Sequence, residues 1–166
     1  MAGYLDQYGE SDERRSKIIL RIIGISVAVV IATSILYYLF KNHGQESVAK
    51  NFIQLLRRQD YPAAYQLWGC TPSKPCPDYT YDKFLEDWSA KGSGVDPASL
   101  SLVDSETCGS GVILTIHAGP AREEKLWIEK NNPAIGFSPL PRCPHKGALS
   151  IMMHRTLGKL RKPLLK

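Results

Sequence analysis

The residues best suited to do chemistry in this chain are its four cysteines: Cys70, Cys76, Cys108 and Cys143. All four follow a long apolar run near the N-terminus, as disulfides in an oxidising compartment require. Cys70 and Cys76 enclose the five residues TPSKP, and so short a loop readily brings two α-carbons within the roughly 4.4–6.8 Å of a disulfide. We therefore predict a Cys70–Cys76 disulfide.

A zinc site is the alternative use of these cysteines. Such a site would need thiolates in a reducing compartment, with His145 as a further ligand. The placement of the cysteines argues against that compartment. We expect neither a metal ion nor a cofactor.

Acid–base catalysis would draw on carboxylates and tyrosines that gather in the middle of the chain: Asp78, Asp82, Glu86 and Asp87, with Tyr65, Tyr79 and Tyr81. The acids fall in or beside a stretch that has the pattern of an exposed helix, and the tyrosines fit core or rim positions. The sequence contains no nucleophile elbow, phosphate loop or zincin motif. We expect a protein that is not an enzyme, with a small pocket enzyme (isomerase or hydrolase) as the alternative.

The apolar run from Ile18 to Phe40 predicts a transmembrane helix. Its twenty-three residues, at ~1.5 Å each, span roughly 35 Å, enough for a hydrocarbon core of about 30 Å. Arg21 lies near one end and can extend to the headgroups, while aromatic residues cluster at the other. A cleaved signal peptide is the rival interpretation, but the run is longer than a usual signal h-region and ends without a small-residue cleavage site. We favour an uncleaved signal-anchor.

Charge bias orients the helix. Basic residues precede and begin the apolar run, and fewer follow it closely, which predicts a cytoplasmic tail over 1–17 and an inner-membrane, single-pass protein with an extracytoplasmic, periplasmic domain. The net charge of +5 arises from the last residues, since 142–166 carries seven bases and no acid. The charge therefore does not indicate a nucleic-acid partner.

Beyond a connector at 41–45, the domain over 46–143 begins with a helical pattern. Between Glu46 and Arg58 the apolar residues Val48, Phe52, Leu55 and Leu56 recur at helical spacing, with Lys50, Gln54, Arg57 and Arg58 on other faces. Asp60 is a predicted N-cap for a second helix that ends near Trp68. Thr80 is a predicted N-cap for a third, with Gly92 as its stop signal.

From Ser99 the apolar period changes from helical spacing to alternation. Segments 100–106, 112–118 and the region around Leu126 predict strands, and 134–140 predicts a weaker one that Pro139 and Pro141 confine to an edge or to no strand. Three helices followed by an antiparallel meander predict an α+β roll with a concave pocket.

The second cysteine pair is less constrained than the first. By elimination Cys108 would bond Cys143 and close a loop worth a few kcal/mol of unfolded-state entropy. A regular meander, however, would place these two residues at opposite ends of the sheet. Cross-pairing with Cys70 and Cys76 therefore remains an alternative.

The run VAKNFIQLLRRQDYPAAYQLW resembles the opening helix pair of the nuclear transport factor 2-like (cystatin-like roll) superfamily, particularly its small membrane-anchored bacterial members. The resemblance spans roughly residues 46–140 and departs at the proline-broken GFSPLPRC, where such domains usually end on a strong strand. It implies a roll whose pocket would be lined by aromatic and strand residues: Tyr65, Trp68, Trp88, His117 and Trp127. A lone strand histidine such as His117 is more often a surface or satisfied residue than part of a functional pocket.

These features predict an anchored binding or assembly module whose partners are the bilayer and another envelope protein or a small apolar ligand. The layout is similar to the bitopic scaffold component of type IV secretion systems, in architecture alone. The tail over 144–166 shows apolar residues at helical spacing between 148 and 165. We expect it to form a basic amphipathic helix that contacts anionic headgroups through four bases: Arg155, Lys159, Arg161 and Lys162. A solvated tail is the alternative.

Overall fold

The computed structural model describes residues 6–92, 96–119 and 122–144. The chain divides into two compact units, residues 1–41 and 42–166. The described part is α+β, with helices preceding an antiparallel sheet, as the change of period predicts.

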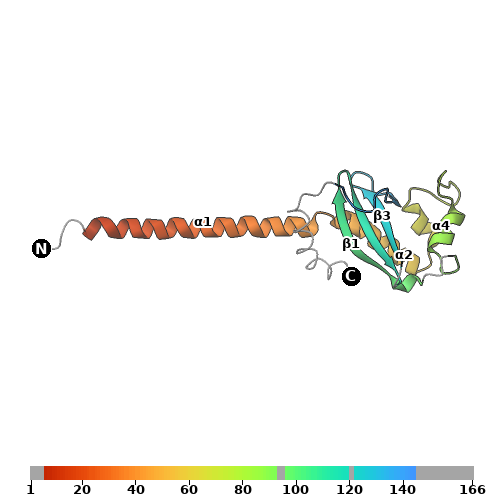
Figure 1. The fold of residues 1–166 in the computed structure, drawn as a ribbon, viewed down its shortest axis with the longest axis horizontal. Coiled ribbons are helices and arrows are strands. Elements are labelled where there is room, and N and C mark those ends of the chain that lie inside the picture. The colour runs from red at the N-terminus through yellow and green to blue at the C-terminus, as the bar shows by residue number, and fades with distance from the viewer. Residues whose placement is uncertain (1–5, 93–95, 120–121, 145–166) are drawn as a thin grey trace. The chain divides into compact units, whose positions relative to one another are not determined.

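The first unit consists of helix α1, Asp6–Phe40 (Figure 1). Its large apolar side chains between Ile18 and Phe40 are mostly exposed, and the most apolar stretch of the helix is not covered by any other described part of the chain. The hydroxyls of Thr33 and Ser34 donate to the carbonyl oxygens of Val29 and Val30, so these polar groups are satisfied within the helix. An exposed apolar helix of this length is consistent with insertion into a membrane.

Helix α2, His43–Arg57, begins the second unit earlier than the sequence pattern indicates. The Asn42 carbonyl accepts the Glu46 N–H at 3.0 Å, so residues 43–45, expected in a connector, form the first turn of α2. The side chain of Asn42 is buried, and this holds the chain in place where the helix starts.

Two shorter helices follow, α3 (Tyr61–Gln66) and α4 (Tyr81–Trp88). Both predicted N-caps are confirmed. Asp60 accepts the Ala63 N–H at 3.3 Å, and Thr80 accepts the Lys83 N–H at 3.4 Å. Each helix ends a few residues before the predicted stop. A 3-10 turn, η1 (Pro97–Ser99), leads into the first strand.

The sheet has four antiparallel strands in the order β1-β2-β3-β4, and is open, with β1 at one edge. The strands are β1 (Leu100–Cys108), β2 (Gly111–Ala118), β3 (Glu123–Glu129) and β4 (Ile135–Phe137). A bulge interrupts the β1–β2 register between Leu102 and Asp104. The short β4 fits the expectation that prolines would limit the last strand.

One face of the sheet packs on the helices and forms the core. Val112, Leu114 and Ile116 alternate along β2, and Leu126 and Ile128 along β3, all of them fully buried. They pack with apolar side chains of the helices: Ala49, Phe52, Leu56, Ala64, Tyr65, Phe84 and Trp88. In Figure 1, α2 runs along the sheet within this second unit.

The chain beyond β4 crosses the opposite face of the sheet. Lys125 Nζ donates to the Pro141 carbonyl oxygen at 2.7 Å, and the Cys143 N–H lies 3.5 Å from Glu106 on β1. Cys143 thereby reaches Cys108 at the end of β1, with a Cα–Cα distance of 5.3 Å, and the two form a disulfide. The alternative of cross-pairing does not occur. The objection drawn from a regular meander fails because β4 ends after Phe137 and the chain turns back across the strands.

Two expectations fall on residues outside the described part of the chain. The amphipathic tail helix predicted over 148–165 lies there, with its bases Arg155, Lys159, Arg161 and Lys162. His145 lies there too. Their roles stay predictions.

Candidate functional site

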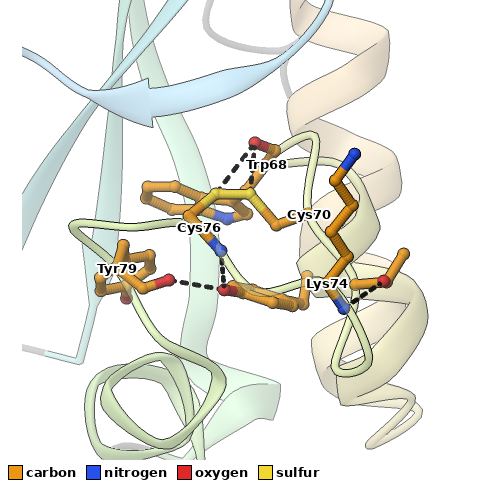
Figure 2. The surroundings of a disulfide bond; sticks show 7 residues. Trp68, Cys70, Lys74, Cys76 and Tyr79 are labelled. Carbon is orange, nitrogen blue, oxygen red and sulfur yellow. Dashed lines mark hydrogen bonds between the residues drawn. A yellow bond between two sulfur atoms is a disulfide. The ribbon is translucent and has the colours of Figure 1, made fainter.

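The predicted Cys70–Cys76 disulfide forms, with a Cα–Cα distance of 5.5 Å (Figure 2). The Tyr65 hydroxyl, at the base of this loop, accepts the Cys76 N–H at 3.0 Å and donates to the Tyr79 carbonyl oxygen at 2.5 Å. Tyr65 is fully buried. Its hydroxyl therefore joins the disulfide loop to the segment before α4, which is a structural role.

Aromatic rings fill the space between this loop and the helices. The Trp68 ring centroid lies 4.7 Å from that of Tyr79 and 4.8 Å from that of Phe137 on β4. Phe52 meets Trp88 edge to face at 5.0 Å. Trp68 Nε1 is buried and has no hydrogen-bond partner among the described residues. These contacts show that the aromatic rings of this region pack against one another as part of the core.

The Tyr79 hydroxyl pairs with a carboxylate on α4. It donates to Asp87 Oδ2 at 2.8 Å and accepts from Trp88 Nε1 at 3.1 Å. Burial, together with the neighbouring Asp87 carboxylate, raises the pKa of Tyr79 above its ordinary value of 10.0. The hydroxyl is consequently neutral and a weak proton donor near neutral pH.

The five residues expected around a pocket lie on two faces of the sheet. Tyr65, Trp68 and Trp88 belong to the aromatic core on the helix-covered face. His117 and Trp127 take the opposite side, because they pair in register with Ser101 and Ile113 rather than with core positions. The fold does not gather the five around one cavity. Successive residues of a strand point to opposite faces of the sheet, and this alternation places His117 and Trp127 on the face that the helices do not cover.

On that second face, His117 and Trp127 have ordinary structural surroundings. His117 Nε2 lies 2.8 Å from Glu123 Oε1, and both side chains are exposed. Trp127 covers Gly111, where an added Cβ would come within 2.3 Å of the indole ring. Glycine is therefore required at 111 for the close approach of Trp127.

A buried polar network lies where α2 begins, and the sequence gives little sign of it. The Ser105 hydroxyl donates to Glu46 Oε1, Asn42 Nδ2 donates to Ser105 Oγ at 3.3 Å, and Thr107 Oγ1 donates to Asn42 Oδ1 at 2.7 Å. Asn42, Glu46 and Ser105 are all buried. Since each group is partnered, the network fits a role in fixing α2 against β1.

A groove lies between α2 and the edge strand β1. Its volume is about 230 Å³. The helix contributes Lys50, Ile53, Gln54 and Arg57, and the strand contributes Leu100, Ser101 and Leu102. None of these described lining residues is acidic, and two of them, Lys50 and Arg57, are basic. Arg57 Nη2 donates to the Leu100 carbonyl oxygen at 2.6 Å and spans the two walls.

The spacing of the helical wall follows from α-helix geometry. Lys50, Ile53, Gln54 and Arg57 stand at i, i+3, i+4 and i+7, which places them along one stripe of α2. The helical pattern predicts only that the polar members of this stripe lie on other faces than the apolar one. Only the pairing of α2 with β1 shows that they form one wall of a groove.

Metal binding finds no support in the described residues, which contain no group of three or more His, Cys, Asp or Glu side chains placed to hold an ion. Both disulfides leave no free cysteine. No family model, curated protein or solved structure matches this chain.

Proposed function

We propose that this protein is a membrane-anchored, extracytoplasmic binding or assembly module that engages another envelope protein and has no catalytic role. In this proposal α1 crosses the inner membrane once, with residues 1–17 in the cytoplasm. Two features support it: α1 is exposed and apolar, and both disulfides lie in the unit beyond it.

The groove between α2 and β1 is the observation that carries the binding role. At about 230 Å³ it is smaller than the roughly 300–1,000 Å³ pockets that enclose small molecules, and it opens beside an edge strand. Its polar groups are lysine, arginine, glutamine and serine, all of which can donate hydrogen bonds to a ligand. These properties favour a protein segment as the ligand.

A pocket enzyme is the second candidate, and the pairing of Tyr79 with Asp87 is the observation that favours it. A carboxylate beside a tyrosine is the kind of pair that such an enzyme would use. Here both groups are engaged by neighbours within the fold, and the pKa of Tyr79 is raised. The Tyr79–Asp87 pair therefore supports an enzyme less strongly than the groove supports a binding module.

The resemblance to the nuclear transport factor 2-like superfamily stays part of this proposal. The order of three helices followed by a meander agrees with it. The open sheet and the very short β4 depart from a closed roll. A scaffold role akin to that of the bitopic type IV secretion component rests on the same architecture.

A topology assay with site-specific photocrosslinking tests the proposal in native membranes. Protease added to spheroplasts should digest the domain, and full protection would contradict the orientation. A photoreactive residue at Gln54, inside the groove, should give a discrete adduct. The same residue at Glu86, exposed on α4, serves as the matched control. Absence of adducts at Gln54 and at exposed positions on the other faces would contradict a binding module.

A further inference from the structure

The carbonyl oxygen of Trp68 lies beside both sulfur atoms of the Cys70–Cys76 disulfide. It is 3.4 Å from Cys70 Sγ and 3.9 Å from Cys76 Sγ, and Figure 2 shows it next to the bond. A disulfide sulfur carries no hydrogen to donate, and no other group in the described chain donates to this oxygen. Trp68 and Cys70 are both buried. The oxidised protein therefore holds a backbone acceptor that lacks a donor among the described residues, and such a group needs an explanation.

Reduction of the disulfide supplies the missing donor. A thiol is a weak hydrogen-bond donor, and either sulfur, once it carries a hydrogen, can donate to the Trp68 carbonyl oxygen from its present position. An equilibrium between two forms shifts only through interactions that differ between them, and this bond exists in the reduced form alone. The carbonyl oxygen also favours a protonated thiol over a thiolate, which makes the reduced pair a poor nucleophile and a poor metal ligand.

The disulfide loop is joined to α4 through two tyrosines. The Tyr65 hydroxyl accepts the Cys76 N–H at 3.0 Å and donates to the Tyr79 carbonyl oxygen at 2.5 Å (Figure 2). The Tyr79 hydroxyl in turn donates to Asp87 on α4 at 2.8 Å. The bond to Cys70 holds Cys76 at the start of this series of contacts. Breaking that bond therefore loosens the connection between the loop and α4.

The fold can lose this disulfide and keep the other. Cys70 and Cys76 are 6 residues apart, whereas Cys108 and Cys143 are 35 apart. Opening the shorter loop returns less chain entropy to the unfolded state, so the domain stays folded when this bond alone is reduced. Cys76 is only partly buried, whereas Cys70 is buried, so Cys76 Sγ is the sulfur that an incoming thiolate reaches more easily.

We propose that the Cys70–Cys76 disulfide is a reversible redox switch, which a dithiol protein opens and whose reduction loosens α4 while the sheet stays folded. A thiolate of the dithiol attacks Cys76 Sγ, the S–S bond breaks, and Cys70 leaves as a thiolate that takes a proton from water. The second thiolate of the dithiol attacks the mixed disulfide and releases Cys76, which is protonated in the same way. Two electrons and, through water, two protons pass to the cysteine pair, and the dithiol becomes a disulfide. The switch goes beyond the proposed binding function and does not depend on it.

Graded reduction of the full chain in detergent micelles tests the switch against a permanent structural link. Mixtures of reduced and oxidised dithiothreitol set the redox ratio, and alkylation after acid quenching, followed by mass spectrometry, measures the free thiol at each cysteine. Cys70 and Cys76 should become reduced at a ratio about threefold to tenfold lower than Cys108 and Cys143, because the first pair gains a hydrogen bond on reduction. Equal ratios, or the reverse order, would overturn the proposal.

Hydrogen exchange reports what the reduction does to the fold. At the ratio where only Cys70 and Cys76 are reduced, peptides covering 76–88 should exchange at least about threefold faster than in the oxidised protein, while peptides from β2 and β3 stay unchanged. Cys70→Ser/Cys76→Ser should match the reduced chain, because serine hydroxyls also donate to the Trp68 carbonyl. Unchanged exchange over 76–88 in both samples would identify a purely structural link.

A tyrosine variant tests the route from the loop to α4. Tyr65→Phe removes the acceptor of the Cys76 N–H and the donor to Tyr79, so exchange over 76–88 should be fast in both redox forms and the difference between them should shrink. Tyr81→Phe is the matched control, because the Tyr81 hydroxyl has no hydrogen bond among the described residues. Equal differences in the two variants would contradict the route. If Tyr65→Phe does not fold, Cys70→Ser/Cys76→Ser decides the outcome.

Discussion

Helix α2 has two stripes that meet different parts of the molecule. Ala49, Phe52 and Leu56 are 0 % exposed and lie in the aromatic core. Lys50, Gln54 and Arg57 line the groove beside β1. The first stripe finds its partners inside the fold. The second lies at the surface and brings polar and cationic side chains to the groove, with Arg57 bonded to the Leu100 carbonyl of β1.

The largest test of this comparison replaces one member of the core stripe. Phe52→Ala should lower the free energy of unfolding by about 3–5 kcal/mol, because a fully buried ring that contacts Trp68, Phe84 and Trp88 leaves a cavity. Gln54→Ala, on the groove stripe, should change it by less than about 0.5 kcal/mol. Chemical denaturation of the full chain in micelles measures both. Similar losses would erase the distinction between the stripes.

The two disulfides should differ in their contribution to stability, since they close loops of different length. Cys108 and Cys143 are 35 residues apart, and Cys70 and Cys76 are 6 apart. Loop-closure entropy predicts a loss of about 4 kcal/mol for the Cys108→Ser/Cys143→Ser pair and about 2 kcal/mol for the Cys70→Ser/Cys76→Ser pair. Denaturation of the two double variants compares them. The reverse order would show that strain or residual structure outweighs chain entropy.

The polar network at the start of α2 should have a smaller effect. Ser105→Ala removes the donor to Glu46 and the acceptor of Asn42, both of them buried, and should cost about 1–3 kcal/mol. Ser101→Ala is the matched control, because Ser101 lies on the same strand but is exposed. Equal stability of Ser105→Ala and Ser101→Ala would show that the network contributes nothing at the groove-bearing helix.

The smallest effect concerns pH and the Tyr79 hydroxyl. Burial and Asp87 raise the pKa of Tyr79 in the folded state above its unfolded value of 10.0. The folded state thus holds the proton more tightly, so this stabilisation is complete below pH 10 and falls as the pH rises above it. Denaturation above pH 10 should show a smaller fall in stability for Tyr79→Phe than for the natural chain. Parallel curves would contradict the assignment.

Much of the domain could be predicted from local sequence because the responsible forces act locally. The caps Asp60 and Thr80, the change of period near Ser99 and the short Cys70–Cys76 loop depend on residues close together in the chain. The exposed apolar helix α1 follows from composition alone. These features do not require knowledge of which elements pack together.

Tertiary structure decided what lies between distant segments. The strand register places His117 and Trp127 on the opposite face of the sheet from Tyr65, Trp68 and Trp88. The chain turns after Phe137 and brings Cys143 to Cys108. The groove needs α2 beside the edge of β1, a contact between residues more than forty positions apart, as in the Arg57 bond to Leu100. Sequence patterns report which side of each element is apolar; only packing determines which polar sides come to face each other.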